Sequence, residues 1–189
     1  PAVPVTVAVL ENREIRSWQE FSGRLEAIDR VQIRSRVAGA IHGVHFREGA
    51  LVKAGDLLFT IDPEPFKTAV TQAEGQLASA RARLQLASTE FERGQKLSAG
   101  NSISKSDFDQ RGNALAEAQA AVTTAEATLH AAQLELDYTN VRAPVSGRVG
   151  KVEMTIGNLV AAGSTSPALT TLVSVDPIYA AFNVSEETV

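Results

Sequence analysis

The stretch IRSRVAGAIHGVHFREGALVKAG at residues 33–55 recurs at residues 141–163 as VRAPVSGRVGKVEMTIGNLVAAG, and this repeat is the strongest indication of the fold. Nine of the 23 aligned positions are identical, including three glycines in register. A further match, LFTIDP at 58–63 with LVSVDP at 172–177, requires six additional residues near 164–169. The chain therefore contains an internal duplication of one small module. The identical pairs are Arg34/Arg142, Val37/Val145, Gly39/Gly147, Val44/Val152, Gly49/Gly157, Leu51/Leu159, Val52/Val160, Ala54/Ala162 and Gly55/Gly163.

Each copy has the pattern of short strands separated by tight turns. Its apolar segments are short, and glycines recur between them at a spacing that marks turns. A few short strands cannot bury a face alone, so the two copies are expected to pack together as one small β-sandwich with quasi-two-fold symmetry. Six glycines are expected at the turns of this sandwich: Gly39, Gly49, Gly55, Gly147, Gly157 and Gly163.

Residues 64–137, between the two copies, have the pattern of a coiled-coil hairpin. Apolar residues recur in alternating steps of four and three, which is the 3.5-residue period of a coiled-coil seam. The period stops at 98–101 and restarts after Ser104-Lys105-Ser106-Asp107, which resembles a capping box, while Asp62 is the expected N-cap of the first helix. Two helices of about 33 residues, each about 50 Å long, are therefore predicted to project from the sandwich. The main seam residues are Phe66, Val70, Leu77, Leu84, Phe91, Phe108, Leu115, Val122, Leu129 and Leu136.

The composition excludes several classes of function. The 189 residues are 44% apolar and 21% charged, which is typical of a folded protein and not of a disordered one. The net charge of −4 and an aromatic content of 5% argue against a nucleic-acid partner. Cysteine is absent, which excludes thiolate catalysis, disulfides and zinc–thiolate sites within this chain. No apolar run is long enough to span a membrane.

This organisation resembles the periplasmic adaptors, or membrane fusion proteins, of tripartite efflux pumps, in particular the resistance-nodulation-division (RND) class of AcrA/MexA type. The resemblance rests on both copies of the repeat, and RAPVSGRVG at 142–150 is its most specific string. It implies an elongated, modular α+β fold. Residues 31–63 and 138–175 would form a split lipoyl-type sandwich, and residues 64–137 the inserted antiparallel coiled-coil hairpin. Residues 1–30, where Val3, Val5, Val7 and Val9 alternate like a strand, would join 176–189 in part of an antiparallel β-barrel.

The family also has a hairpin-tip motif of Arg, three residues, Leu, six residues and Ser, and Arg93, Leu97 and Ser104 match it. The resemblance implies that these three residues dock onto an outer-membrane channel of the TolC type. It further implies an inner-membrane transporter as second partner, and self-association into a ring as a hexamer or trimer of dimers. The expected location is the periplasm, with an anchor to the inner membrane outside this chain. No cofactor is implied.

Three other interpretations remain. The first is an adaptor for an ABC exporter or a type I secretion system, because such adaptors share much of this pattern. The second is a lipoyl or biotinyl carrier domain, which the sequence disfavours because the only methionine, Met154, has no adjacent lysine to be modified. The third is a coiled-coil spacer without channel contact, which predicts that replacing Arg93, Leu97 or Ser104 leaves export intact.

The residues that could bind a metal or act in catalysis do not form a recognisable metal site or active site. His42 and His45 would point to opposite faces of a strand, which makes them a poor metal pair. Ser102 and Lys105 match the S-x-x-K spacing of penicillin-recognising enzymes, but neither an SDN nor a KTG motif accompanies them. No nucleophile, base and acid form a set, so we expect no enzymatic activity.

Overall fold

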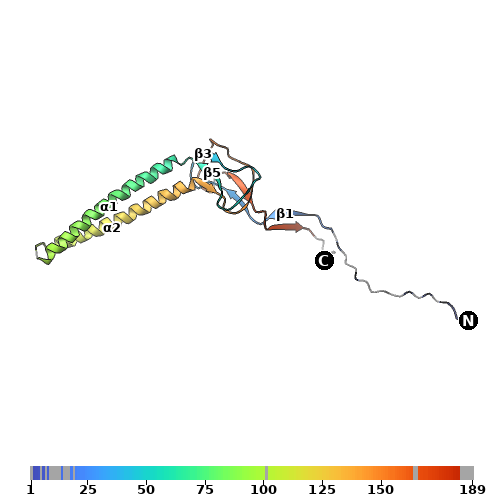
Figure 1. The fold of residues 1–189 in the computed structure, drawn as a ribbon, viewed down its shortest axis with the longest axis horizontal. Coiled ribbons are helices and arrows are strands. Elements are labelled where there is room, and N and C mark those ends of the chain that lie inside the picture. The colour runs from blue at the N-terminus through green and yellow to red at the C-terminus, as the bar shows by residue number, and fades with distance from the viewer. Residues whose placement is uncertain are drawn as a thin grey trace.

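The computed structural model describes residues 2–4, 6, 8, 14, 18, 20–100, 102–163 and 166–183. A helical hairpin extends from one end of a small β domain, and a two-stranded ribbon extends from the other (Figure 1). This arrangement confirms the elongated α+β fold class. Of the strand expected near the N-terminus, Val5, Val7 and Val9 lie outside the described residues, as do 164–165 of the insertion and 184–189 of the expected barrel segment.

The β domain is a sandwich of two four-stranded antiparallel sheets. The first sheet has the order β2-β9-β7-β4, with bounds Arg30–Ile33, Thr170–Val173, Gly147–Val149 and Leu51–Val52. The second has the order β6-β5-β3-β8, with bounds Asn140–Arg142, Leu57–Ile61, Gly39–Val44 and Leu159–Val160.

The two sheets are related by the sequence repeat, strand for strand. Strands β2, β3, β4 and β5 of the first copy correspond to β6, β7, β8 and β9 of the second. Each sheet contains two strands from each copy: β2 and β4 lie with β7 and β9 in one sheet, and β3 and β5 lie with β6 and β8 in the other. Neither copy therefore completes a sheet without the other. This interleaving is why the module needs both copies, and why a hairpin inserted between the copies does not divide the sandwich.

The sandwich encloses one apolar core to which both copies contribute. Its largest fully buried side chain is Phe59, which meets Phe46 edge to face with ring centroids 5.3 Å apart. Aromatic pairs of this geometry stabilise a core beyond the area they bury. The buried core residues are Ile33, Val37, Ile41, Leu58, Phe59, Ile61, Val141, Ala143, Val149, Val160, Leu169 and Leu172.

The six glycines expected at turns fall into two groups. Gly49, Gly55, Gly157 and Gly163 have φ between 74° and 95°, which is the left-handed conformation that favours glycine. The prediction is wrong for Gly39 and Gly147, because each is the first residue of a strand, in β3 and β7. Glycine is needed at these two positions because a neighbouring chain segment lies too close for a side chain. A Cβ on Gly147 would lie 2.2 Å from the carbonyl oxygen of Val173, and one on Gly39 would lie 2.7 Å from Ile61 Cγ2.

The hairpin consists of α1 (Glu64–Ala99) and α2 (Lys105–Tyr138). Its middle is closed by a cluster of Leu77, Ala80 and Val122, against which Leu84, Ala125 and Leu129 pack. Nearer the tip, Phe91 and Phe108 meet with ring centroids 5.3 Å apart. The small alanine side chains allow the two helices to approach closely along the seam.

Two expectations at the base of the hairpin need correction. Phe66 packs against the sandwich core instead of within the helical seam, because the first turn of α1 lies beside the sheets. The N-cap position of α1 is Pro63 and not Asp62, although the Asp62 carboxylate accepts a hydrogen bond from the Glu64 N–H at 3.1 Å. Tyr138, the last residue of α2, also packs on the core. Both ends of the hairpin are therefore attached to the sandwich.

The ribbon consists of β1 (Gly23–Ala27) and β10 (Ile178–Phe182), paired antiparallel from Gly23↔Phe182 to Ala27↔Ile178. Phe21 stacks on Phe182 with ring centroids 5.9 Å apart. Several large apolar side chains of the ribbon are exposed, including Leu25 and Tyr179. Among the described residues, no helix is both long and apolar enough to cross a membrane.

Candidate functional site

The tip of the hairpin is the candidate site, and its turn is organised around Leu97. The Leu97 carbonyl accepts hydrogen bonds from the N–H groups of Gly100 (3.2 Å) and Ser102 (2.9 Å). These two bonds satisfy a carbonyl at the end of α1 and direct the chain back toward α2. The Leu97 side chain remains 38% exposed although it is apolar. A single exposed leucine does not by itself indicate a partner, since Leu86 of the same helix is 65% exposed; what distinguishes Leu97 is its place at the tip, next to Arg93 and the turn.

Arg93 lies one helical turn before Leu97, so the two side chains share a face of α1. The Arg93 side chain is 61% exposed, and its Nη1 donates to Glu90 Oε1 at 2.8 Å. The guanidinium is thus held near the helix but remains open to solvent. The tip therefore presents one cation and one apolar side chain on the same face.

Ser104 is the N-cap of α2. Its φ and ψ of −73° and 154° are extended, and its Oγ accepts a hydrogen bond from the Asp107 N–H at 3.0 Å. Serine is well suited to this position because its hydroxyl satisfies one of the four N–H groups at a helix start. The side chain is also exposed, so its hydroxyl proton remains available to an acceptor on another molecule.

The sequence reasoning missed Glu90, which the structure places between two arginines. Glu90 Oε1 accepts from Arg93, and Oε2 accepts from Arg111 Nη1 of the facing helix at 2.7 Å. The signal was present at Arg111, which is a charged residue at a seam position between Phe108 and Leu115. A charge in an apolar seam calls for an opposite charge on the facing helix.

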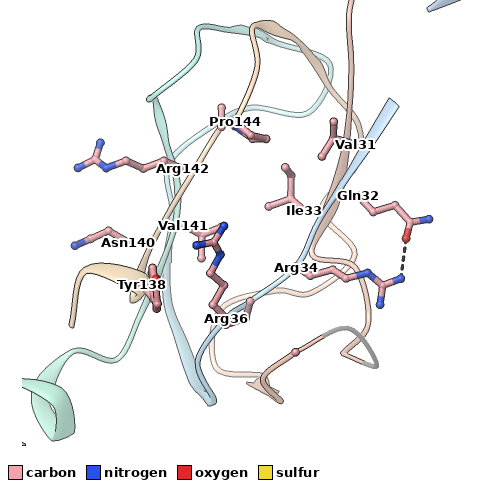
Figure 2. A pocket seen from close by; sticks show the side chains of 13 residues that line it. Val31, Gln32, Ile33, Arg34, Arg36, Tyr138, Asn140, Val141, Arg142 and Pro144 are labelled. Carbon is pink, nitrogen blue, oxygen red and sulfur yellow. Dashed lines mark hydrogen bonds between the residues drawn. The ribbon is translucent and has the colours of Figure 1, made fainter. Parts of the chain in front are cut away.

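A cavity of the sandwich lies between the edge strands β2 and β6 (Figure 2). It has a volume of about 690 Å³, and Ile33 and Val141 are among the residues that line it. Its arginines already serve the fold: Arg34 donates to Gln32 at 2.7 Å and to the Ser166 carbonyl, and Arg142 donates to the Gly55 carbonyl at 2.9 Å. A third, Arg36, lies over the Tyr138 ring at 5.0 Å from its centroid. These arginine side chains join segments of the sandwich to one another.

The residues considered for other chemistry are placed apart. His45 is hydrogen-bonded to Thr60 Oγ1 at 2.8 Å, and His42 is exposed on β3. Ser102 donates to the Gly100 carbonyl within the hairpin turn, and Lys105 is the first residue of α2. Among the described residues, no three His, Asp or Glu side chains are grouped so as to hold a metal ion.

The sequence matches the family model described as RND MFP, barrel-sandwich hybrid domain, over residues 29–172. It is 38% identical to the multidrug resistance protein MdtA of Pectobacterium carotovorum subsp. carotovorum (strain PC1) over 183 residues, which are 97% of this chain and 44% of that protein. It is 36% identical to MdtA of Escherichia coli O45:K1 (strain S88 / ExPEC) over 186 residues, 98% of this chain and 45% of that protein. The chain thus spans a little under half the length of these relatives.

Solved structures show the same fold. A MacA-MexA chimeric protein that contains the Pseudomonas aeruginosa MexA alpha-hairpin domain is 27% identical, with a TM-score of 0.65 over 87% of this chain and 54% of that one. ZneB from Cupriavidus metallidurans is 26% identical, with a TM-score of 0.57 over 87% of this chain and 69% of that one. The similarity covers the hairpin as well as the sandwich.

Proposed function

Because the chain belongs to the membrane fusion protein (MFP) family of RND transporters, we propose that it is part of a periplasmic adaptor for multidrug efflux. In this proposal the adaptor links an inner-membrane transporter of the RND class to an outer-membrane channel of the TolC type. The relatives that carry the name multidrug resistance protein support the efflux role. The RND description of the family model favours an RND transporter over an ABC exporter.

The single observation that carries the docking role is the exposed tip face. A hairpin about 50 Å long places this face far from the sandwich, where a partner in a second membrane can reach it. Arg93 supplies a cation and Leu97 an apolar contact, while Ser104 supplies a hydroxyl at the start of α2. We propose that these three residues contact the channel, and that several copies gather as a hexamer or trimer of dimers so that their tips meet it together.

The direct test is co-purification of the full-length protein with its membrane partners. We expect affinity-tagged adaptor, extracted from membranes in mild detergent, to retain both an RND transporter and a TolC-type channel. Omitting the channel gene is the control for nonspecific recovery. Recovery of the transporter alone, with channel-independent export, would instead support a spacer without channel contact.

Two substitutions at Ser104 distinguish its role as a helix cap from its proposed role in docking. We expect Ser104→Ala to lower hairpin stability by about 1 kcal/mol, since it removes the hydroxyl that accepts from the Asp107 N–H. Ser104→Asp retains a capping oxygen and should keep the wild-type stability in thermal denaturation. Channel binding should weaken in both variants, because neither can donate a hydroxyl proton. If Ser104→Asp binds the channel as wild type does, the serine acts only as a cap.

A further inference from the structure

Glu90 is shared between the two helices of the hairpin. One carboxylate oxygen accepts from Arg93 of its own helix at 2.8 Å, and the other accepts from Arg111 of α2 at 2.7 Å. Arg111 Nη1 also donates to the Glu90 main-chain carbonyl at 3.0 Å. The carboxylate is therefore held from both sides, and Arg93 is linked through it to the opposite helix.

Gly94 provides the space in which Arg111 lies. Gly94 is buried, and a Cβ at this position would lie 2.6 Å from Arg111 Cδ. The stem of Arg111 thus crosses α1 directly over Gly94 before its guanidinium reaches Glu90. Any larger residue at position 94 would displace the stem.

The surroundings of the pair favour a fixed geometry. The side chains of Glu90 and Arg111 are 38% and 31% exposed, whereas a second ion pair between the helices, Arg81–Glu126, is 50–61% exposed with a contact at 2.9 Å. Phe91 follows Glu90 on α1 and packs against Phe108 of α2, and this ring pair holds the two helices together beside the ion pair. An exposed ion pair restricts the conformations of its side chains little, whereas a half-buried ion pair with two hydrogen bonds restricts them more strongly.

The charges of the cluster also suit a docking surface. Two arginines and one glutamate leave a net charge of +1, and the most exposed of the three side chains is Arg93. Without Arg111 the Glu90–Arg93 pair would be neutral. Arg111 therefore allows Glu90 to hold Arg93 while this three-residue cluster keeps a net positive charge.

We propose that Arg111 is a positioning residue for channel docking, which acts through Glu90 to fix the guanidinium of Arg93 one turn from Leu97. Gly94 contributes to this positioning, because the absence of a side chain there leaves room for the stem of Arg111. The inference rests on the proposed docking role of Arg93. Fixing a flexible side chain before binding lowers the entropy that association costs.

A double-mutant cycle on the full-length protein tests this role against a purely structural one. Arg111→Met retains the unbranched stem over Gly94 and removes the guanidinium. We expect it to weaken binding to the purified TolC-type channel about three- to tenfold, the effect of ordering one long side chain. In an Arg93→Ala background the same substitution should cause no further loss, because Arg111 acts through Arg93.

Two glycine variants provide a matched pair that leaves Arg111 in the chain. Gly94→Ala should weaken channel binding to the same extent as Arg111→Met, since the new Cβ displaces the arginine stem. Gly75→Ala lies on the same helix with no atom within 4 Å of its Cβ, so it should leave channel binding unchanged and raise the melting temperature of the hairpin. Glu126→Gln, which breaks the Arg81 pair, should also leave channel binding unchanged.

The outcomes distinguish this inference from the function on which it rests. Wild-type affinity in both Arg111→Met and Gly94→Ala, with binding lost in Arg93→Ala, overturns the role of Arg111 alone. Equal losses from Arg111→Met in the wild-type and Arg93→Ala backgrounds also overturn it, because the effect then does not pass through Arg93. A wild-type protein that does not bind the channel overturns the docking role and this inference together.

Discussion

Replacement of Arg93 by aspartate is expected to abolish channel docking and efflux while leaving the protein folded. The substitution exchanges the exposed cation of the tip for an anion, so an acceptor on the channel would be repelled instead of bound. Loss of one partner of a charge pair buried in an interface costs about 2–5 kcal/mol, which corresponds to a loss of affinity of about 30-fold to several thousandfold. Channel binding and drug susceptibility of cells that express the full-length variant measure this effect.

The folding cost of Arg93→Asp should be small. The introduced aspartate would lie three residues from Glu90, a like-charge pair that costs a few tenths of a kcal/mol on an exposed helix, and Arg111 still neutralises Glu90. Arg83→Asp is the matched control, because it makes the same charge reversal on an exposed residue of α1, about 15 Å farther from the tip. Full efflux and channel binding by Arg93→Asp would refute the docking assignment.

Replacement of Gly147 by alanine is expected to have the largest effect on stability of any single methyl group added to the sandwich. The new Cβ would lie 2.2 Å from the Val173 carbonyl oxygen, 2.9 Å from its carbon and 3.3 Å from Ser174 Cα. All three are main-chain atoms of β9 or of the residue after it, so no rotamer change relieves the clash and β7 must move away from β9. We expect a loss of about 3 kcal/mol, seen in calorimetry as a melting temperature about 10 °C lower.

Gly39, the repeat-related position, provides the control. A Cβ there would meet only the side chain of Ile61, at 2.7 Å from Cγ2. Ile61 is fully buried, so this methyl must be displaced within the core, but the main chain of the sheet can stay in place. Gly39→Ala should therefore cost about 1 kcal/mol. Equal losses from the two variants would mean that the close approach to Val173 is not what requires glycine at position 147.

The sequence was informative wherever a physical constraint acts along the chain. The duplication required two copies to share one core, and the structure contains that core, with Ile33 and its counterpart Val141 both buried in it. The 3.5-residue period located the helical seam, because side chains that face a partner helix must recur at the helical repeat. Leu77 and Val122 lie in its buried cluster as predicted, and the turn falls after Ala99, within the predicted break.

Other features depend on distances between segments that the sequence does not encode locally. The repeat required pairing but not the exchange of strands between sheets, since separate or interleaved sheets bury similar apolar surface. In the sequence, Gly39 and Gly147 look like turn glycines. Only the structure shows that Ile61 and Val173 occupy the space where a side chain at these positions would lie. The same holds for Glu90, whose role appears only when Arg111, 21 residues later, lies against it. Periodicity thus determined which faces are buried, whereas the packing of distant backbones decided which atoms meet there.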